Sequence, residues 1–357
     1  MLTRLRVFTL LTLIIAAGAL ALLFAAAVHV RAQEDGGVTV TLDADQPVIE
    51  HGAQDAWDGR FTDPGAITFY DGQFHMFRNG FAQWPGWVGI AYHTSPDGVT
   101  WTQQGDGPVL TTDDVPFADV AALASSVYVD ADGTWVLYVY TWGNQFSSAP
   151  ESWAIGRATA PDPLGPWTVD PAPVLMPGSE GSWDAAQVGT PSVVPITDGY
   201  GLFYTGVDAG GMRMVGMAVS YDGIDWVKND DPSTISDLFA ESDPIMKPGE
   251  EGAWDAAYIH QPRVTVTPQG LVMSYRSSSP GGVDKAYGLA LSLDDGYTWV
   301  RYGDNPVLFD KDIQRRGMWF NALLYHDGQY FMPVELQRGY QNQTDIYMAT
   351  LEGDPFQ

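Results

Sequence analysis

The sequence contains five copies of one unit, and this repetition constrains the fold more than any other feature. Each copy opens with proline and two aliphatic residues: Pro47-Val48-Ile49, Pro108-Val109-Leu110, Pro173-Val174-Leu175, Pro244-Ile245-Met246 and Pro306-Val307-Leu308. Successive copies start 61, 65, 71 and 62 residues apart. Repeats of this length predict one supersecondary unit per copy, each packed against its neighbours.

Within a copy, short apolar runs separated by turn residues predict four antiparallel strands. Two markers recur around these strands. A Trp-Asp pair often lies in the loop before the first strand, and an Asp-Gly-x-x-Trp turn precedes the fourth: Trp57-Asp58, Trp183-Asp184 and Trp254-Asp255, then residues 97–101, 222–226 and 295–299. Four antiparallel strands per unit are typical of a propeller blade. The sequence therefore predicts an all-β protein, a five-bladed β-propeller, in which residues repeated in every blade are structural.

The fifth copy contains three predicted strands and ends before a fourth. Residues 38–46, beginning VTVTLDADQ, lie directly before Pro47, where a fourth strand lies in the other copies. We expect this N-terminal strand to complete the last blade and close the ring, which would remove exposed sheet edges. Residues 33–357 are then a single propeller domain.

Residues 1–32 resemble an export signal. Arg4 and Arg6 precede an uncharged apolar run over residues 7–28, and Val30-Arg31-Ala32 fits a small-residue cleavage site. The run is also long enough to span a bilayer, so an uncleaved signal anchor is the alternative. Both interpretations predict a secreted or extracytoplasmic protein without other membrane contact.

Composition excludes several classes of function. The chain has no cysteine, so disulfides and thiol chemistry are unavailable. Its formal net charge of -27 repels nucleic acid and anionic membranes. No phosphate-binding loop or His-Glu-x-x-His motif is present. A Ca²⁺ ion in an acidic channel is compatible with the composition, but no spacing assigns ligands to it, so we expect no metal site, no cofactor and a monomer.

Candidate functional residues lie where the copies differ. In an antiparallel blade, the start of the first strand and the end of the second lie on one face, close to the axis. These places carry carboxylates, a histidine, arginines and indoles, which suit a neutral, hydroxyl-rich ligand such as a sugar. The predicted catalytic residues are Asp63, Glu335 and His260, and the predicted substrate-binding residues are Arg78, Trp142, Gln261, Arg276 and Trp319. Asp63 is the strongest candidate; its alternative role is to cap the loop at the strand entry.

The stretch DPGAITFYDGQFHMF in blade one and the strand entries GTPSVV and HQPRVT resemble the five-bladed propeller glycoside hydrolases, which include families 43 and 32. The resemblance covers the chain after the export signal. It implies that Asp63 is the general base or nucleophile, and that the substrate is an arabinoside, xyloside or fructoside. In this superfamily a blade-two aspartate and a blade-three glutamate complete the site, but the matching positions are Ala124-Ser125 and Gly189.

Because the acid of the superfamily is missing, another residue must supply the proton. Glu335 is the first choice, since a lone carboxyl group in an apolar strand gains a raised pKa on burial. His260 is the second choice, because imidazole can donate a proton near neutral pH.

Two other functions compete with a glycosidase. One is a catalytically inactive propeller that binds glycans. The other is a sialidase-like enzyme, suggested by the Asp-box SLDDGYTW. The blade count disfavours a sialidase, as does the acidic charge, which opposes an anionic substrate.

Overall fold

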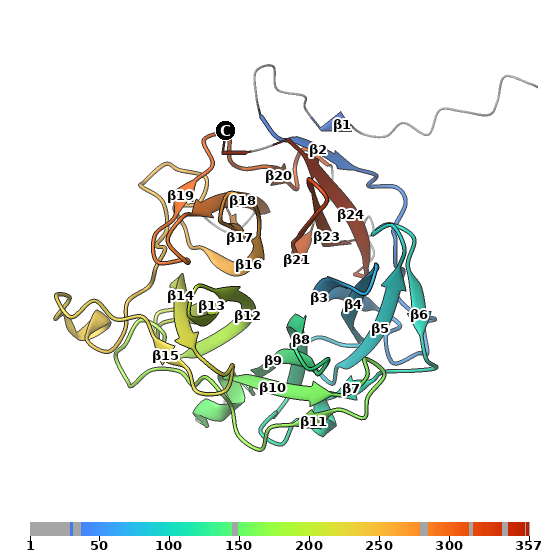
Figure 1. Cartoon of the computed structure of the whole chain (residues 1–357), viewed down its shortest axis with the longest axis horizontal. Helices are drawn as coiled ribbons and strands as arrows, with labels where there is room; N and C mark the ends of the chain where they lie inside the picture. Colours follow the sequence, from blue (N-terminus) through green and yellow to red (C-terminus); the bar gives the residue numbers. More distant parts are fainter. Residues whose placement is uncertain are drawn as a thin grey trace, which may run out of the picture.

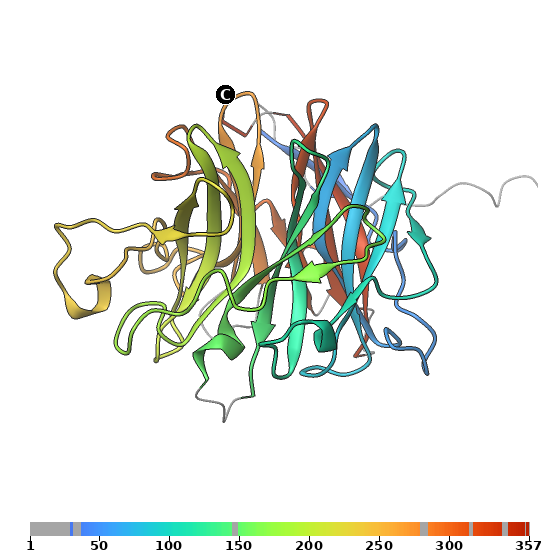
Figure 2. The same cartoon turned by 60° about the horizontal axis from the view of Figure 1, so that its bottom comes forward.

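The computed structural model describes residues 29–30, 37–144, 149–278, 285–313, 317–337, 342–353 and 355–356. Five antiparallel sheets surround a central axis in chain order (Figure 1). In a view turned by 60°, the strands run between the two faces of the disc (Figure 2). The predicted five-bladed propeller is confirmed. The predicted export signal lies outside the described residues, except for His29 and Val30.

In each blade the first strand lies nearest the axis. Blade one contains β3 (Phe61–Tyr70), β4 (Gln73–Phe81), β5 (Gly89–Ser95), β6 (Thr102–Gln104) and β7 (Leu110–Thr111). Blade two contains β8 (Ala121–Val129), β9 (Trp135–Trp142), β10 (Ile155–Ala160) and β11 (Thr168–Val169). Blade three contains β12 (Gln187–Ile196), β13 (Gly199–Val207), β14 (Arg213–Ser220) and β15 (Val227–Lys228).

Blade four contains β16 (His260–Val266), β17 (Leu271–Ser278), β18 (Lys285–Ser292), β19 (Val300–Arg301) and β20 (Leu308–Phe309). Blade five contains β21 (Met318–Asn321), β22 (Leu324–His326), β23 (Gln329–Gln337) and β24 (Thr344–Glu352), together with β1 (His29–Val30) and β2 (Thr39–Leu42). Three 3₁₀ turns lie in loops: η1 (Thr112–Asp114), η2 (Pro150–Trp153) and η3 (Asp237–Phe239).

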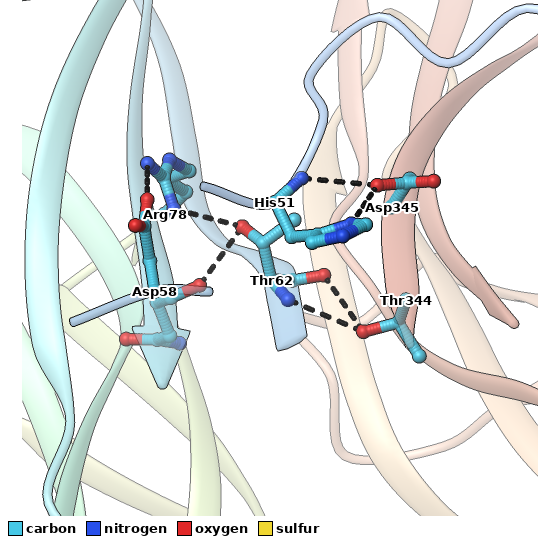
Figure 3. Close-up of polar contacts among 7 residues, drawn as sticks. His51, Asp58, Thr62, Arg78, Thr344 and Asp345 are labelled. Atoms are coloured by element: carbon cyan, nitrogen blue, oxygen red, sulfur yellow. Dashed lines mark hydrogen bonds and ion pairs between the residues drawn. The ribbon is translucent and has the colours of Figure 1, made fainter. Parts of the chain in front are cut away.

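The N-terminal strand closes the ring, as the sequence predicts. β2 pairs antiparallel with β24, with Val40 opposite Leu351, so residues near 40 lie beside the last strand of the propeller (Figure 1). Further contacts join blade five to blade one. Asp345 accepts hydrogen bonds from the backbone N–H and Nδ1 of His51 at 3.0 and 2.7 Å, and Thr344 binds the N–H of Thr62 at 3.2 Å (Figure 3). The last blade is therefore assembled from both ends of the chain.

The repeated Trp-Asp loops are part of the scaffold. Asp58 binds Arg78 at 2.5 Å (Figure 3), Asp184 binds Lys228 at 2.6 Å, and Asp255 binds Arg301 at 2.8 Å. The tryptophan of each pair packs inside its blade; the indole of Trp183, for example, stacks on Tyr204 with ring centroids 5.7 Å apart. Each loop thus anchors one blade by an ion pair and an aromatic contact.

Because β2 closes the ring, truncation of its buried Leu42 should strongly lower the stability of the protein. This side chain is 1% exposed and belongs to the core of blade five. Leu42→Ala should lower the free energy of unfolding by about 2–5 kcal/mol, because it leaves a cavity. Urea unfolding followed by tryptophan fluorescence measures the change. Thr41→Ala, on the exposed side of the same strand, is the matched control and should change stability by about 0.5 kcal/mol or less.

Candidate active site

Each first strand contains an irregularity in its pairing close to the axis, and this irregularity positions the site. The interruptions lie between Asp63 and Ala66, Ala124 and Ser126, Gly189 and Ser192, His260 and Arg263, and Met318 and Asn321. A bulge re-aims side chains and is frequent next to active sites. By strand register, Asp63 corresponds to His260, whereas alignment on the following proline pairs it with Gln261.

The Asp63 carboxyl group is 1% exposed and is held on one side only. Its Oδ1 accepts hydrogen bonds from Asn79 Nδ2 at 2.8 Å and from the N–H of Gly65 at 2.9 Å. Within the described residues, Oδ2 has no partner. Burial raises the pKa of Asp63 to about 6, and the two hydrogen bonds oppose this rise. Asp63 therefore caps its turn, as the alternative predicted, and also keeps one oxygen available.

Asn79, which the sequence analysis did not select, fixes Asp63 to the neighbouring blade. Its Oδ1 accepts from the N–H of Ala124 at 2.8 Å, and its Nδ2 donates to the carbonyl of Ala124 at 3.0 Å. The side chain is 1% exposed. Asn79 thus connects blade one to blade two and orients the carboxylate through the same amide.

Glu335 occupies a position that has another role in the other blades. The residues opposite the bulge in blades one, three and four are Arg78, Tyr204 and Tyr275. All three bind the aspartate of their own Trp-Asp loop, at 2.5, 3.1 and 3.1 Å respectively. The fifth copy has no Trp-Asp pair in the corresponding stretch of the sequence. Glu335 is therefore the one member of this set that is a carboxylic acid.

The Glu335 carboxyl group is 3% exposed, and its Oε2 has no partner within the described part of the chain. Burial raises its pKa well above the usual value, and the charge on Asp63 raises it further. Hydrogen bonds from the Thr344 hydroxyl and the N–H of Phe320 offset part of this rise. The charge of Asp63 thus acts on Glu335, and each carboxyl group keeps one oxygen without a partner among the described residues.

Arg263 reaches from blade four to three other blades, and it is not among the residues predicted from sequence. Its Nε donates to the carbonyl of Asn321 at 2.7 Å, and its Nη1 binds both the hydroxyl and the carbonyl oxygen of Ser125 and reaches Pro191 O at 3.4 Å. The guanidinium therefore links blades two, three and five, and its charge lowers the pKa of Asp63. The sequence does distinguish Arg263 from its equivalents, because the other blades carry an uncharged alanine, serine or asparagine at this position after the bulge.

Tyr140 lies beside Gly189, the position of blade three without a carboxylate. Gly189 stands where the superfamily has its acid, and a Cβ atom there would lie 3.3 Å from Tyr140 Cδ2 and 3.3 Å from Gln187 Nε2. The phenol ring of Tyr140 is buried, and burial together with the Asp63 charge raises its pKa well above the usual value. A side chain at this position would therefore need a small shift of Tyr140 or Gln187.

A pocket of about 230 Å³ opens beside Glu335, between blades five and one. Its lining is Phe61, Phe81, Trp84, Trp319, Phe320, Glu335, Asn342 and Thr344. The aromatic wall extends through Trp142, whose ring centroid lies 5.3 Å from that of Trp84. The Trp319 indole is 39% exposed. Glu335 and Trp319 thus line one pocket whose walls are mainly aromatic.

The other predicted residues differ in their surroundings. Arg78 is 2% exposed, and its ion pair with Asp58 favours a structural role over contact with a substrate. Gln261 is also buried; its N–H donates to Thr205 Oγ1 at 2.8 Å. The pKa of His260 lies well below the usual value because of burial and the nearby cations Arg276, Arg213 and Lys285. A neutral imidazole is a poor proton donor, so the structure favours Glu335 as the acid.

Several solved structures with a similar fold are glycoside hydrolases, and one is a β-1,2-mannobiose phosphorylase from Listeria innocua. A family 117 glycoside hydrolase from Zobellia galactanivorans has 15% identity and a TM-score of 0.61, with 90% of this chain and 91% of that chain covered. An endo-1,4-β-xylanase from Bacteroides thetaiotaomicron has 17% identity and a TM-score of 0.58, with coverages of 82% and 95%. A thermostable family-43 glycoside hydrolase has 15% identity and a TM-score of 0.57, with coverages of 81% and 88%.

This chain has the fold of the five-bladed propeller glycoside hydrolases. The predicted resemblance is confirmed at the level of the fold. No family model matches the sequence, and no curated protein is similar to it in sequence. Among the described residues, no three histidine or acidic side chains are grouped to hold a metal ion. Nor does the described part of the chain include a helix long and apolar enough to cross a bilayer.

Proposed function

We propose that the protein is an exported glycoside hydrolase that uses Asp63 and Glu335 as its catalytic pair. One observation supports this most strongly: two buried carboxyl groups from neighbouring blades influence each other, and each keeps one oxygen without a partner. Canonical glycoside hydrolysis needs two carboxyl groups, one protonated and one ionised. The fold shared with glycoside hydrolases supports the same conclusion.

The different surroundings of the two carboxyl groups assign their roles. Glu335, with the more strongly raised pKa, is the general acid that protonates the leaving oxygen. Asp63, with a pKa of about 6, is ionised at neutral pH and is the base or nucleophile at the anomeric carbon. Asn79 and the N–H of Gly65 hold one oxygen of Asp63, which leaves the other oxygen without a partner among the described residues and available for the reaction.

The aromatic pocket binds the sugar in this proposal. Trp319 and Trp84 offer ring faces on which the apolar face of a pyranose or furanose can stack. The resemblance names arabinosides, xylosides and fructosides as substrates. A panel of 4-nitrophenyl glycosides and oligosaccharides of these sugars tests the proposal, with release of product as the readout. No hydrolysis of any member would contradict it for these sugars.

The pH dependence of kcat/KM should report the two carboxyl groups. The rate requires an ionised Asp63, so it should rise as pH increases through about 6. It also requires a protonated Glu335, so it should fall again when that group loses its proton at higher pH. Initial rates between pH 4 and 9 check the profile. In Glu335→Gln the alkaline fall should disappear, and its persistence would assign it to another group.

A catalytically inactive glycan-binding propeller is the second candidate. The absence of a carboxylate at Gly189, where the superfamily has its acid, favours it. Calorimetric titration with oligosaccharides separates the two candidates. Binding without product after long incubation would support the inactive propeller.

A further inference from the structure

Four cationic or titratable side chains gather around His260, on the side of Trp319 that faces blade four. Three of them belong to blade four, namely His260 at the start of β16, Arg276 near the end of β17 and Lys285 at the start of β18. The fourth is Arg213, at the start of β14 in the adjoining blade three; we term the four residues the blade-four cluster. Arg276 Nη1 lies 3.4 Å from His260 Nε2. The charges of Arg213, Arg276 and Lys285 all act on the imidazole. Positive charge is therefore concentrated within one part of the site.

None of these cations forms an ion pair among the described residues, although the charges of Asp310 and Glu335 act on Lys285. The sequence holds 44 acidic and 17 basic residues, so a carboxylate is easily available. Arg78, Lys228 and Arg301 use one, in ion pairs of 2.5 to 2.8 Å. By contrast, Arg213, Arg276 and Lys285 form no ion pair within the part of the chain that the structure describes.

Arg276 is the most deeply buried cation of the cluster and lacks a full set of hydrogen-bond partners. It is 5% exposed, and its Nε has no hydrogen-bond partner among the described residues. Burial and the charge on Arg276 also lower the pKa of Lys285 to about 8. Buried charges without counter-charges destabilise a fold unless a ligand supplies the opposite charge. The cluster is therefore poised to accept an anion.

The cluster touches the catalytic pocket through Trp319. Lys285 Nζ lies 3.0 Å and the Arg276 guanidinium carbon 5.6 Å from the centroid of the Trp319 ring. Trp319 lines the same pocket as Glu335. Arg276 also acts electrostatically on Glu335, lowering its pKa. An anion held by the cluster would thus lie beside the sugar whose bond is broken.

From this geometry we infer that the blade-four cluster binds the carboxylate of an acidic sugar, so that the substrate is a uronide. Guanidinium and ammonium groups bind carboxylates through short, charge-assisted hydrogen bonds. The inference rests on the proposed glycoside hydrolase function and replaces its neutral substrate by an anionic one. The acidic net charge of the chain does not exclude an anionic substrate. At physiological ionic strength charges beyond about 8 Å are screened, whereas a cationic cleft attracts anions locally.

Matched pairs of substrates test the inference. We would compare 4-nitrophenyl glucuronides and galacturonides with the corresponding neutral glucosides and galactosides. The wild type should prefer the uronides. Lys285→Gln and Arg276→Gln should each raise KM for uronides by about 10- to 100-fold, the effect of losing a hydrogen bond to a charged group, and Lys285→Gln should change KM for neutral glycosides little. Equal effects on both substrate classes would overturn the inference.

Lys247→Gln is the matched control. Lys247 also lies over an aromatic ring, with Nζ 4.2 Å from the centroid of Phe239, but it is exposed and does not line the pocket. The substitution removes the same charge and should leave both KM values unchanged. A tenfold change in this variant would show that overall charge, and not the cluster, controls affinity.

Two further measurements separate this inference from the proposed function. Calorimetric binding of a galacturonide oligomer to the wild type, lost in Arg276→Gln, with no turnover of any glycoside, would support the anion site and contradict the hydrolase. Millimolar inorganic phosphate provides the other test. If phosphate accelerates the breakdown of neutral glycosides, the cluster holds a free oxyanion and the uronide inference is wrong.

Discussion

Replacement of Asp63 by asparagine is expected to reduce turnover by about 10²–10⁴-fold and to leave the fold intact. Asparagine can still accept the hydrogen bonds that Asn79 and the N–H of Gly65 give to Oδ1. It cannot be ionised, so it can neither activate water nor attack the anomeric carbon. Initial rates on the best substrate of the panel measure the loss, and circular dichroism verifies the fold.

The same substitution should increase stability above pH 6. The pKa of Asp63 is raised in the folded protein from 3.8 to about 6, so the folded state binds this proton more tightly than the unfolded state. Stability therefore falls as pH rises through the interval between these two values, and the charged form is unfavourable at neutral pH. Asp63→Asn should recover about 1–3 kcal/mol at pH 8 and little at pH 4. Thermal unfolding at both pH values measures this difference.

Asp106→Asn is the matched control for both measurements. Asp106 is exposed in a loop of blade one, and its substitution removes the same charge. This variant should keep full activity and show no pH-dependent gain in stability. If Asp63→Asn retained full activity, Asp63 would not be catalytic. If it lost activity without gaining stability at pH 8, the carboxylate would be better stabilised than its burial indicates.

The fold was predictable because the same pattern of strands and turns recurs in five copies. Five openings of the Pro-aliphatic type fix the blade count, and the missing fourth strand of the last copy points to the segment that precedes Pro47. Closure by β2 therefore followed from sequence. The structural role of Trp-Asp was predictable for the same reason, since a pair present in several blades cannot mark one site.

The centre of the site was less predictable, because its contacts depend on bulges and on neighbouring blades. Alignment of the repeats on their prolines makes Asp63 equivalent to Gln261 of blade four. Alignment by strand register makes it equivalent to His260. Arginine is a residue type that often binds ligands, so Arg78 was a reasonable candidate. Its side chain instead forms an ion pair with Asp58 of the same blade. Arg263 reaches three other blades, and no local pattern contains those partners.

Glu335→Gln is expected to have the second large effect, and this effect should depend on the leaving group. Glutamine can keep the contacts with Thr344 and the N–H of Phe320, but it has no proton to donate. Hydrolysis of oligosaccharides, whose leaving alkoxide needs a proton, should fall by about 10²–10⁴-fold. Hydrolysis of 4-nitrophenyl glycosides should fall much less, because nitrophenolate leaves without protonation.

The ratio of these two losses distinguishes an acid from a structural residue. Loss of structure would reduce both reactions by the same factor, whereas loss of the proton donor changes their ratio. Glu352→Gln, at the exposed end of β24, removes one carboxylate from the same blade and should change neither rate. His260→Gln provides the competing test, because burial and three cations keep its imidazole neutral. A ratio that changes in His260→Gln and stays constant in Glu335→Gln would assign the proton to blade four.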